Sequence, residues 1–436
     1  DGQPSLTQAS RFNLYHLKIA AHAHTQVSIP AKALTGRAYE GHIFWDTEIF
    51  MLPFYLYTEP EIAKTLLRYR YQTLEGARIR ARSLGYRGAC YAWESTVSGL
   101  DVTPKSLSLN HSKTEVPIFT GEQQIHVTAD VAYALSRYWD ATLDHEFMMG
   151  CGAEILFETA RFWVSRLTRC GELYHLKTVV GPDEYHFNVQ DNAFTNWMAR
   201  FNLAKAHEVF QWFFALAPDR LGELRKKIGL EWNEVNLWKT LLEKIFIPSP
   251  NERGVIEQFQ GFFSLKPIQL QESERNRPPL QRLLNWRELN ELQIVKQADV
   301  LMLFFLFPHQ FSTEIMRANY LYYEPKTDHG SSLSLAVHAA VAARSGLKDQ
   351  ALQSWETCLY MDLMNHMANT ELGIHAATLG GCWQALVFHL LGIQLTPQGI
   401  RIPTHHPPIL PTGTSKIQLK LTYRGKLYPL SWKLTP

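Results

Sequence analysis

Residues 298–307, with the sequence ADVLMLFFLF, are apolar on almost every side of the helix that they would form. Such a helix must be enclosed by other elements, because it has no polar face to turn to water. Residues 385–391 share this pattern. Residues 155–167 instead predict an amphipathic helix, since their apolar side chains recur at helical spacing on one face, at Ile155, Leu156, Ala160, Trp163, Val164 and Leu167.

Helical periodicity of these two kinds continues from about residue 10 to residue 395. The alternation of half-exposed helices with buried ones predicts a mainly α protein with two concentric layers of helices. Periodicity alone gives neither the number of helices nor their closure into a ring.

The character of the sequence changes after Gly392. Residues 416–423 alternate between polar and apolar side chains, and residues 426–434 do the same after a turn near Gly425. This pattern predicts two strands in a small C-terminal β domain at residues 396–436, beside a helical domain at residues 1–395. Helix-breaking prolines separate the two parts, at Pro397, Pro403, Pro407, Pro408 and Pro411.

The composition excludes several classes of function. The 436 residues are 46% hydrophobic, and 43 basic against 41 acidic residues give a formal charge of +2, without a basic block that would bind nucleic acid. The longest apolar run, residues 300–307, is too short to cross a bilayer of roughly 30 Å, so no membrane partner is expected. Five cysteines form no Cys-x-x-Cys pair, which favours free thiols in the cytoplasm. The chain opens with Asp1 and has no signal peptide, so we expect an upstream segment to be missing.

Two carboxylates stand together in the turn Gly181-Pro-Asp-Glu-Tyr-His186. A glycoside-cleaving enzyme needs a protonated carboxyl as proton donor, and aromatic neighbours such as Tyr185 would raise the pKa of one by desolvation. Asp183 and Glu184 both fit this role. The alternative is that Asp183 caps a helix and Glu184 is a solvated charge.

Two aromatic–acid pairs, Trp45-Asp46 and Trp93-Glu94, combine an indole that can stack on a sugar with a carboxylate that can accept its hydroxyl protons. Amphipathic helices also place a core Trp beside a surface acid, so these pairs are a modest indication of sugar binding. The pair Lys296-Gln297 precedes the apolar residues 298–307. The alternative for Lys296 is an ammonium group that reaches solvent from the end of the helix.

Thr327-Asp-His-Gly-Ser-Ser332 precedes an apolar helix at residues 333–343. Free N–H groups and the positive end of the helix dipole would hold an anion there, with His329, Ser331 and Ser332 as further donors. A glycine pair, Gly380-Gly381, stands before the buried helix at residues 383–391 and would let a ligand approach the backbone. Helix capping and helix packing are the alternatives at these two places. No metal site is expected, because His22-x-His24 and His405-His406 lack a third ligand.

Taken in order, these segments resemble glycoside hydrolase family 65, whose members are mostly inverting phosphorylases of α-glucosides such as maltose, kojibiose, nigerose and trehalose. The resemblance covers nearly the whole chain. It is carried by His42-Ile-Phe-Trp-Asp-Thr-Glu-Ile-Phe50, Gly85-Tyr-Arg-Gly88, Trp93-Glu-Ser95, His126-Val-Thr-Ala-Asp130, Gly181-Pro-Asp-Glu-Tyr-His186, Glu257-Gln-Phe259, Lys296-Gln-Ala-Asp299, Tyr323-Glu-Pro325 and Gly373-Ile-His-Ala-Ala377.

The resemblance implies an (α/α)6 barrel with a small C-terminal β domain, preceded in full-length members by an N-terminal β-sandwich that this chain lacks. It also implies inverting phosphorolysis of an α-glucosidic disaccharide to β-glucose 1-phosphate, with Glu184 as general acid and inorganic phosphate as nucleophile. No cofactor other than phosphate as co-substrate is implied, and dimers are usual among relatives.

The same resemblance assigns the binding residues. Those that hold the glucose are Trp45, Asp46, Trp93, Glu94, Lys296 and Gln297, and those that hold phosphate are His329, Ser331, Ser332, Gly380 and Gly381. We expect His126, Thr128, Tyr185 and residues 103–115 at the wall around the acceptor sugar. The acceptor and the linkage are not determined by these motifs.

Asp328 departs from the pattern expected of the phosphorylases, because it places a carboxylate beside the phosphate seat. We expect it to act as a helix-capping residue that points away from the seat. One rival hypothesis is an inverting hydrolase with Asp328 as general base, which requires about 6.5–9.5 Å between the two carboxyl groups. Another is a catalytically silent carbohydrate-binding barrel.

Overall fold

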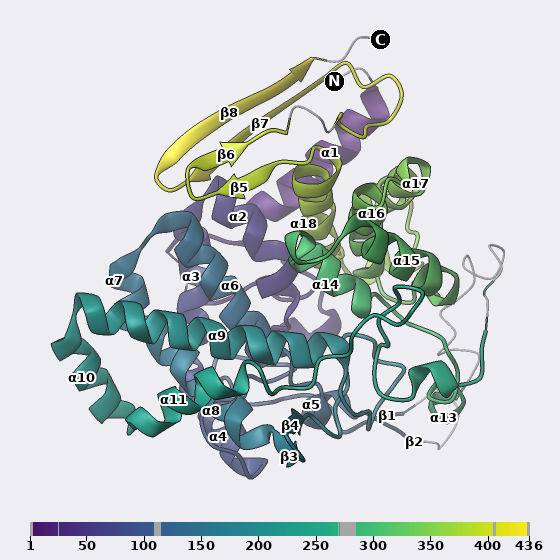
Figure 1. Ribbon diagram of the computed structural model, residues 1–436. Coiled ribbons are helices and arrows are strands. Elements are labelled where there is room, and N and C mark those ends of the chain that lie inside the picture. The colour runs from purple at the N-terminus through teal and green to yellow at the C-terminus, as the bar shows by residue number, and fades with distance from the viewer. Residues whose placement is uncertain are drawn as a thin grey trace.

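The computed structural model describes residues 3–24, 26–108, 115–268, 270, 285–403 and 407–433. These residues form an (α/α)6 barrel with a small C-terminal β region, as predicted (Figure 1). None of the described helices is long and apolar enough to cross a membrane. All five cysteines are free.

The inner layer of the barrel is a closed ring of helices, in which each helix packs against the next and the last packs against the first. In order they are α2 (Leu52–Thr58), α6 (Val127–Thr142), α9 (Ala193–Leu216), α14 (Val300–Leu306), α16 (Ser334–Arg344) and α18 (Ala376–Gln384). Every residue of α14 and of α18 is buried, which confirms an inner helix within residues 298–307, although it spans only Val300–Leu306.

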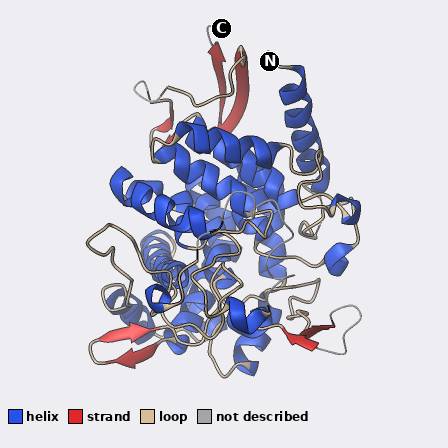
Figure 2. Cartoon of the chain, turned by 90° about the vertical axis from the view of Figure 1, so that its right-hand side faces the viewer, coloured by secondary structure: helices blue, strands red, loops and turns tan. Residues whose placement is uncertain are grey.

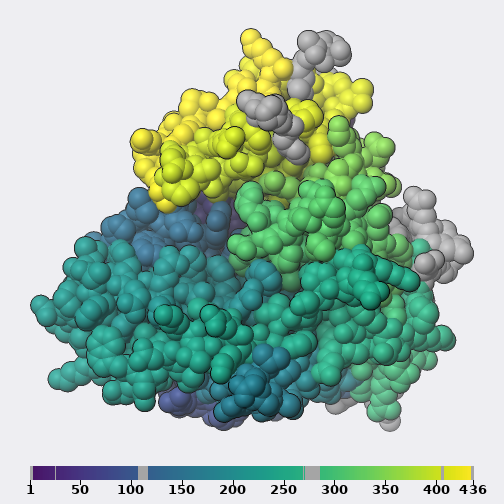
Figure 3. All heavy atoms as spheres, in the orientation of Figure 1, coloured from purple at the N-terminus to yellow at the C-terminus, as the bar shows by residue number. Residues whose placement is uncertain are grey.

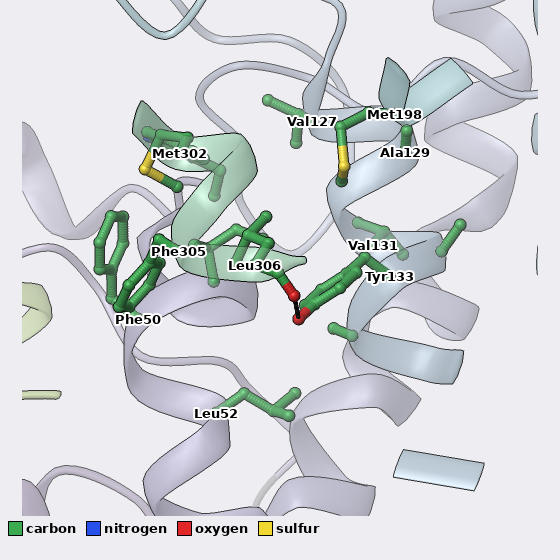
Figure 4. Close-up of a cluster of buried hydrophobic side chains, with 14 of the residues drawn as sticks. Phe50, Leu52, Val127, Ala129, Val131, Tyr133, Met198, Met302, Phe305 and Leu306 are labelled. Atoms are coloured by element: carbon green, nitrogen blue, oxygen red, sulfur yellow. Dashed lines mark hydrogen bonds between the residues drawn. The ribbon is translucent and has the colours of Figure 1, made fainter. Parts of the chain in front are cut away.

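The π-helical segments η2 (Thr47–Met51) and η9 (Ala385–Leu390) extend this inner layer, the first into α2 and the second out of α18. Figure 4 shows side chains of the ring helices meeting in the core, with Phe305 and Leu306 of α14 facing Phe50 of η2 and Tyr133 of α6. The Tyr133 hydroxyl donates to the Leu306 carbonyl at 3.1 Å, so this buried polar group has a partner.

The outer layer packs against the outside of the ring. Its helices are α1 (Pro4–Ala20), α3 (Pro60–Gln72), α8 (Ala153–Arg166), α11 (Trp232–Leu241), α15 (Thr313–Tyr323) and α17 (Lys348–Leu359). In α8 the residues Ile155, Leu156, Ala160 and Trp163 are buried, which confirms the predicted amphipathic helix. Shorter helices connect the layers: α4 (Leu74–Ser83), α5 (Thr120–Gln123), α7 (His145–Phe147), α10 (Pro218–Ile228) and α13 (Trp286–Leu289). The described residues also form single turns of 3-10 or π type: η1 (Ala38–Gly41), η3 (Met148–Gly152), η4 (Phe262–Ser264), η6 (Pro308–Gln310), η7 (Glu324–Lys326) and η8 (Thr370–Leu372).

The C-terminal region consists of two antiparallel hairpins. β5 (Gln394–Thr396) pairs with β6 (Gly399–Arg401), and β7 (Lys416–Tyr423) pairs with β8 (Lys426–Lys433). The two long strands are those predicted, and the turn between them holds Arg424 and Gly425 at positive φ, as a tight hairpin requires. Figure 3 shows this region, in yellow, above the helical part of the molecule. The hairpins β1 (Ser106–Ser108)–β2 (Glu115–Pro117) and β3 (Thr168–Cys170)–β4 (Leu173–His175) lie at the other end (Figure 2).

Candidate active site

A cavity of about 500 Å³ gathers most of the residues that the sequence predicts for a sugar site. Its wall combines segments that are far apart in the chain, each placed by the end of an inner helix or by the loop before one. The predicted residues on the wall are Trp45, Asp46, Trp93, Glu94, Glu184, Lys296, Gln297, Ser331 and Ser332. A disaccharide-sized hollow therefore contains both the acid candidate and the serines of the anion seat.

The structure distinguishes the two carboxylates of residues 181–186. Glu184 is half-buried and faces the cavity. Asp183 is buried and holds the loop in place, since its oxygens accept from the Lys296 backbone N–H at 2.8 Å and from the Gln258 amide at 2.9 Å. Its second oxygen also lies 2.6 Å from His186 Nδ1. Glu184 is thus the group placed to give a proton to a ligand.

Lys296 forms an ion pair with Glu184, with 3.1 Å between Nζ and Oε2. Burial lowers the pKa of Lys296, but the charges around it, Glu184 first, outweigh burial and raise the pKa overall. The side chain thus stays charged inside the cavity, and the interpretation of Lys296 as a lysine that reaches solvent is wrong. The neighbouring Gln297 donates to the Pro182 carbonyl and so ties the start of α14 to the loop of Glu184.

Two indoles form the aromatic part of the wall. Trp45 and Trp93 lie with 6.5 Å between ring centroids and 34° between planes. Burial raises the pKa of both carboxyl groups beside them. For Glu94, His42 Nδ1 lies 2.8 Å from a carboxylate oxygen. Burial, together with the charges of Glu184 and Glu48, raises the pKa of Asp46 to about 7.

His126 lies behind the indoles rather than on the cavity wall, which corrects the prediction that it contacts the sugar. It is fully buried, with its ring centroid 4.8 Å from that of Trp45 and its Nδ1 2.7 Å from Asp130. His126 therefore packs against the indole of Trp45 on the side away from the cavity. Thr128 and Tyr185 are buried too and lie outside the wall, and residues 109–114 of the predicted acceptor loop are outside the described residues.

The anion seat lies at the start of α16, where Gly330, Ser331, Ser332 and Leu333 line the cavity. His329 does not line it, contrary to the prediction. Its backbone has a φ of 52°, and its ring contacts other residues of the loop and helix: Nδ1 lies 2.9 Å from Ser334 Oγ, and Nε2 lies 3.6 Å from Glu324. His329 thus connects the loop to Ser334 and Glu324 instead of lining the cavity.

Gly380 and Gly381 lie inside α18 and serve helix packing, which corrects their assignment to phosphate. A Cβ atom at Gly380 would lie 2.3 Å from the Phe50 carbonyl oxygen, and one at Gly381 would lie 2.8 Å from the Ala336 Cβ. Close approach of α18 to its neighbours therefore requires glycine at both positions. The part of this segment that does reach the cavity is the start of the helix, at His375 and Ala377.

Sequence reasoning missed several residues of the wall, among them the polar side chains of Lys32, Tyr39 and His375. His375 is fixed by Asp362, whose oxygens lie 2.7 Å from its Nδ1 and 3.0 Å from its backbone N. Lys32 is buried, which lowers its pKa against the opposing charges of Asp362, Asp46 and Glu371. His375 stands in the segment 373–377 that carries the family resemblance, so that segment could have indicated it, whereas Lys32 and Tyr39 belong to no such segment.

Residues 11–384 match the sequence profile of the glycosyl hydrolase family 65 central catalytic domain. The chain belongs to this family. It is similar to a kojibiose phosphorylase of Halothermothrix orenii, 42% identical over 430 residues that cover 97% of this chain and 54% of the relative. An α,α-trehalose phosphorylase of Thermoanaerobacter brockii is 37% identical over 431 residues, covering 98% and 53%.

Among solved structures, the chain is similar to a protein from the human microbiome provisionally named kojibiose phosphorylase, with a TM-score of 0.86 and 30% sequence identity. That match covers 99% of this chain and 61% of the other. This family 65 chain thus spans about half the length of the curated relatives it matches.

Within this family 65 site, Asp328 is not placed to act as a general base. It is buried and does not line the cavity. One of its oxygens accepts from the Gly330 N–H at 2.7 Å, and the other accepts from the Tyr185 hydroxyl at 2.6 Å. Asp328 does not cap α16, which corrects the prediction, because the N-cap residue of that helix is Leu333 and no side chain caps it. The carboxylate instead closes the turn at Gly330, before the helix. The geometry offers no support for the hydrolase hypothesis built on this residue.

Proposed function

We propose that this chain contains the catalytic site for inverting phosphorolysis of an α-glucosidic disaccharide, which yields β-glucose 1-phosphate and a free sugar. The observation that carries the proposal is the presence of Glu184 and of the Ser331–Ser332 turn on the wall of one cavity. The names of the relatives, kojibiose and α,α-trehalose phosphorylase, support the same reaction class.

In the proposed reaction, the glucosyl unit lies against Trp45 and Trp93, and Asp46 and Glu94 bind its hydroxyl groups. The Glu184 carboxyl gives its proton to the glycosidic oxygen as the C1–O bond breaks. A phosphate oxygen forms the new bond to C1 from the opposite face of the ring, so the configuration at C1 inverts. Phosphate brings its own negative charge as nucleophile, so no second catalytic carboxylate is required.

Phosphate binding in this proposal rests on the start of α16. Free backbone N–H groups and the helix dipole attract an anion there, and the hydroxyls of Ser331 and Ser332 add donors. Lys32 and His375 line the same cavity and supply further positive or donor groups. Inorganic phosphate is the co-substrate, and the proposal involves no other cofactor.

Replacing Glu184 by Gln tests the acid assignment. The variant keeps the size of the side chain but loses the proton, so turnover should fall by about 10²-fold or more. Binding of the disaccharide, measured by calorimetric titration, should stay within a few-fold of the wild type. Glu172→Gln is the matched control, because that side chain is 84% exposed in the β3–β4 turn and should not affect either quantity. Wild-type turnover in Glu184→Gln would refute the assignment.

A further inference from the structure

One hydrogen bond joins the loop of the acid to the loop of the anion seat. The Tyr185 hydroxyl, next to Glu184 in the chain, donates to Asp328 Oδ2 at 2.6 Å. Both side chains are buried, with 4% of Tyr185 and 7% of Asp328 exposed. The two residues are 143 positions apart, so this contact exists only in the folded barrel.

Asp328 is fixed on its other sides as well. Its Oδ1 accepts from the Gly330 N–H at 2.7 Å, and its backbone N–H donates to the Val295 carbonyl at 3.0 Å. Val295 precedes Lys296, whose backbone N–H in turn donates to Asp183. Asp328 and Asp183 therefore link three segments: the loop of Glu184 (residues 181–186, the acid loop), the residues before α14, and the loop of the anion seat (residues 327–332).

The negative charge of Asp328 is felt inside the cavity. Burial lowers the pKa of Lys296, but Glu184 first and Asp328 among the other charges raise it. A carboxylate two residues before Gly330 would also repel a phosphate bound at the seat if it turned toward the cavity. The position of this side chain consequently matters for anion binding.

We propose that Tyr185 is a positioning residue that holds the Asp328 carboxylate turned away from the anion seat. The proposal rests on phosphate binding in this cavity, as the proposed function requires. One buried bond then has two effects: it keeps a negative charge away from phosphate, and it fixes the acid loop relative to the seat.

Tyr185→Phe removes only the hydroxyl and leaves the ring in place. Without that bond, Oδ2 of Asp328 loses the hydrogen bond from Tyr185, and the carboxylate is less firmly held away from the cavity. We expect phosphate to bind about tenfold more weakly, measured both as KM for phosphate and by calorimetric titration with inorganic phosphate. The KM for the disaccharide should change less than about twofold, because the ring of Tyr185 does not line the cavity.

Asp328→Asn supplies the matched variant, since the amide oxygen can still accept from Gly330 while the charge is gone. This variant should bind phosphate as tightly as the wild type or more tightly. In the double variant Tyr185→Phe/Asp328→Asn, phosphate binding should return to the wild-type value. Such a rescue would not occur if Tyr185 served only the stability of the loop.

Three results would overturn the proposal: no phosphate binding by the wild type, wild-type phosphate binding in Tyr185→Phe, or a loss in that variant that Asp328→Asn does not restore. Failure of the proposed function is a separate outcome, seen when the wild type forms no glucose 1-phosphate from any glucosyl disaccharide. Titration with inorganic phosphate still decides the role of Tyr185 in that event.

Discussion

At the scale of single residues, Asp46 has an acid–base behaviour that suits sugar binding. Burial and the neighbouring charges of Glu184 and Glu48 raise its pKa to about 7, so near neutral pH the carboxyl exists in both protonation states. A protonated carboxyl can donate to a sugar hydroxyl as well as accept from one. Near neutral pH, Asp46 can therefore bind a sugar hydroxyl either as a hydrogen-bond donor or as an acceptor.

The raised pKa of Asp46 predicts how stability depends on pH. An unfolded Asp releases its proton near pH 4, whereas the folded protein retains this proton up to about pH 7. The contribution of Asp46 to the unfolding free energy therefore falls as pH rises from about 4 to about 7 and is constant above it. Urea unfolding across this window should show a smaller decrease in Asp46→Asn than in the wild type. Identical pH dependences would contradict the assignment.

Behind the cavity, Glu48 and Arg70 form a fully buried ion pair. Arg70 Nε and Nη2 donate to the two carboxylate oxygens, both at 2.7 Å, and neither side chain is exposed. Glu48→Gln leaves the guanidinium buried without its counter-charge, so it should destabilise the protein by about 3–5 kcal/mol in urea unfolding. The exposed pair Arg220–Glu146 provides the control, and Glu146→Gln should leave the unfolding midpoint unchanged. An unfolding free energy of Glu48→Gln close to that of the wild type would show that the ion pair does not stabilise the fold behind the cavity.

At the scale of elements, close contacts between helices decide which sequence motifs reach the cavity. The start of α18 contributes His375 and Ala377 to the wall, whereas its glycines face Phe50 and Ala336. Sequence alone does not separate these two uses, because a glycine pair suits both a ligand and a neighbouring helix. The three-dimensional position of η2 against α18 decides it.

Gly380→Ala should destabilise the barrel, because its methyl group would lie 2.3 Å from the Phe50 carbonyl oxygen and the backbone must shift. We expect a loss of about 1–3 kcal/mol, read as a lower melting temperature. Gly222→Ala in α10 is the control, since nothing lies within 4 Å of the added Cβ and the helix should gain about 0.5–1 kcal/mol. Equal melting temperatures for the two variants would argue against a packing role for Gly380.

At the scale of the whole molecule, the local patterns predicted the elements and the family resemblance predicted their arrangement. The largely apolar residues 298–307 contain the predicted helix at Val300–Leu306, and the alternating residues 416–423 form the predicted strand, because burial and strand pairing leave local periodic signals. Closure of the ring depends on contacts between segments at opposite ends of the chain, such as α18 with α2, which no local period contains.

For the site as well, sequence motifs predicted some of the residues on the cavity wall but not others. Trp45, Glu184 and Lys296 stand in motifs and reach the cavity, while Lys32 reaches it from no recognisable motif. His126 stands in a motif but lies behind the wall, where its Nδ1 is 2.7 Å from the buried carboxylate of Asp130. Residue type and spacing therefore predict which segments meet, and the direction of each side chain needs the fold.

The most direct test of phosphorolysis is to incubate the protein with kojibiose, trehalose, maltose and nigerose, each with and without inorganic phosphate, and to follow the products by proton NMR. The account predicts that at least one disaccharide gives β-glucose 1-phosphate, and that no cleavage occurs when phosphate is omitted. Release of free glucose at the same rate without phosphate, or formation of the α-anomer, would contradict it.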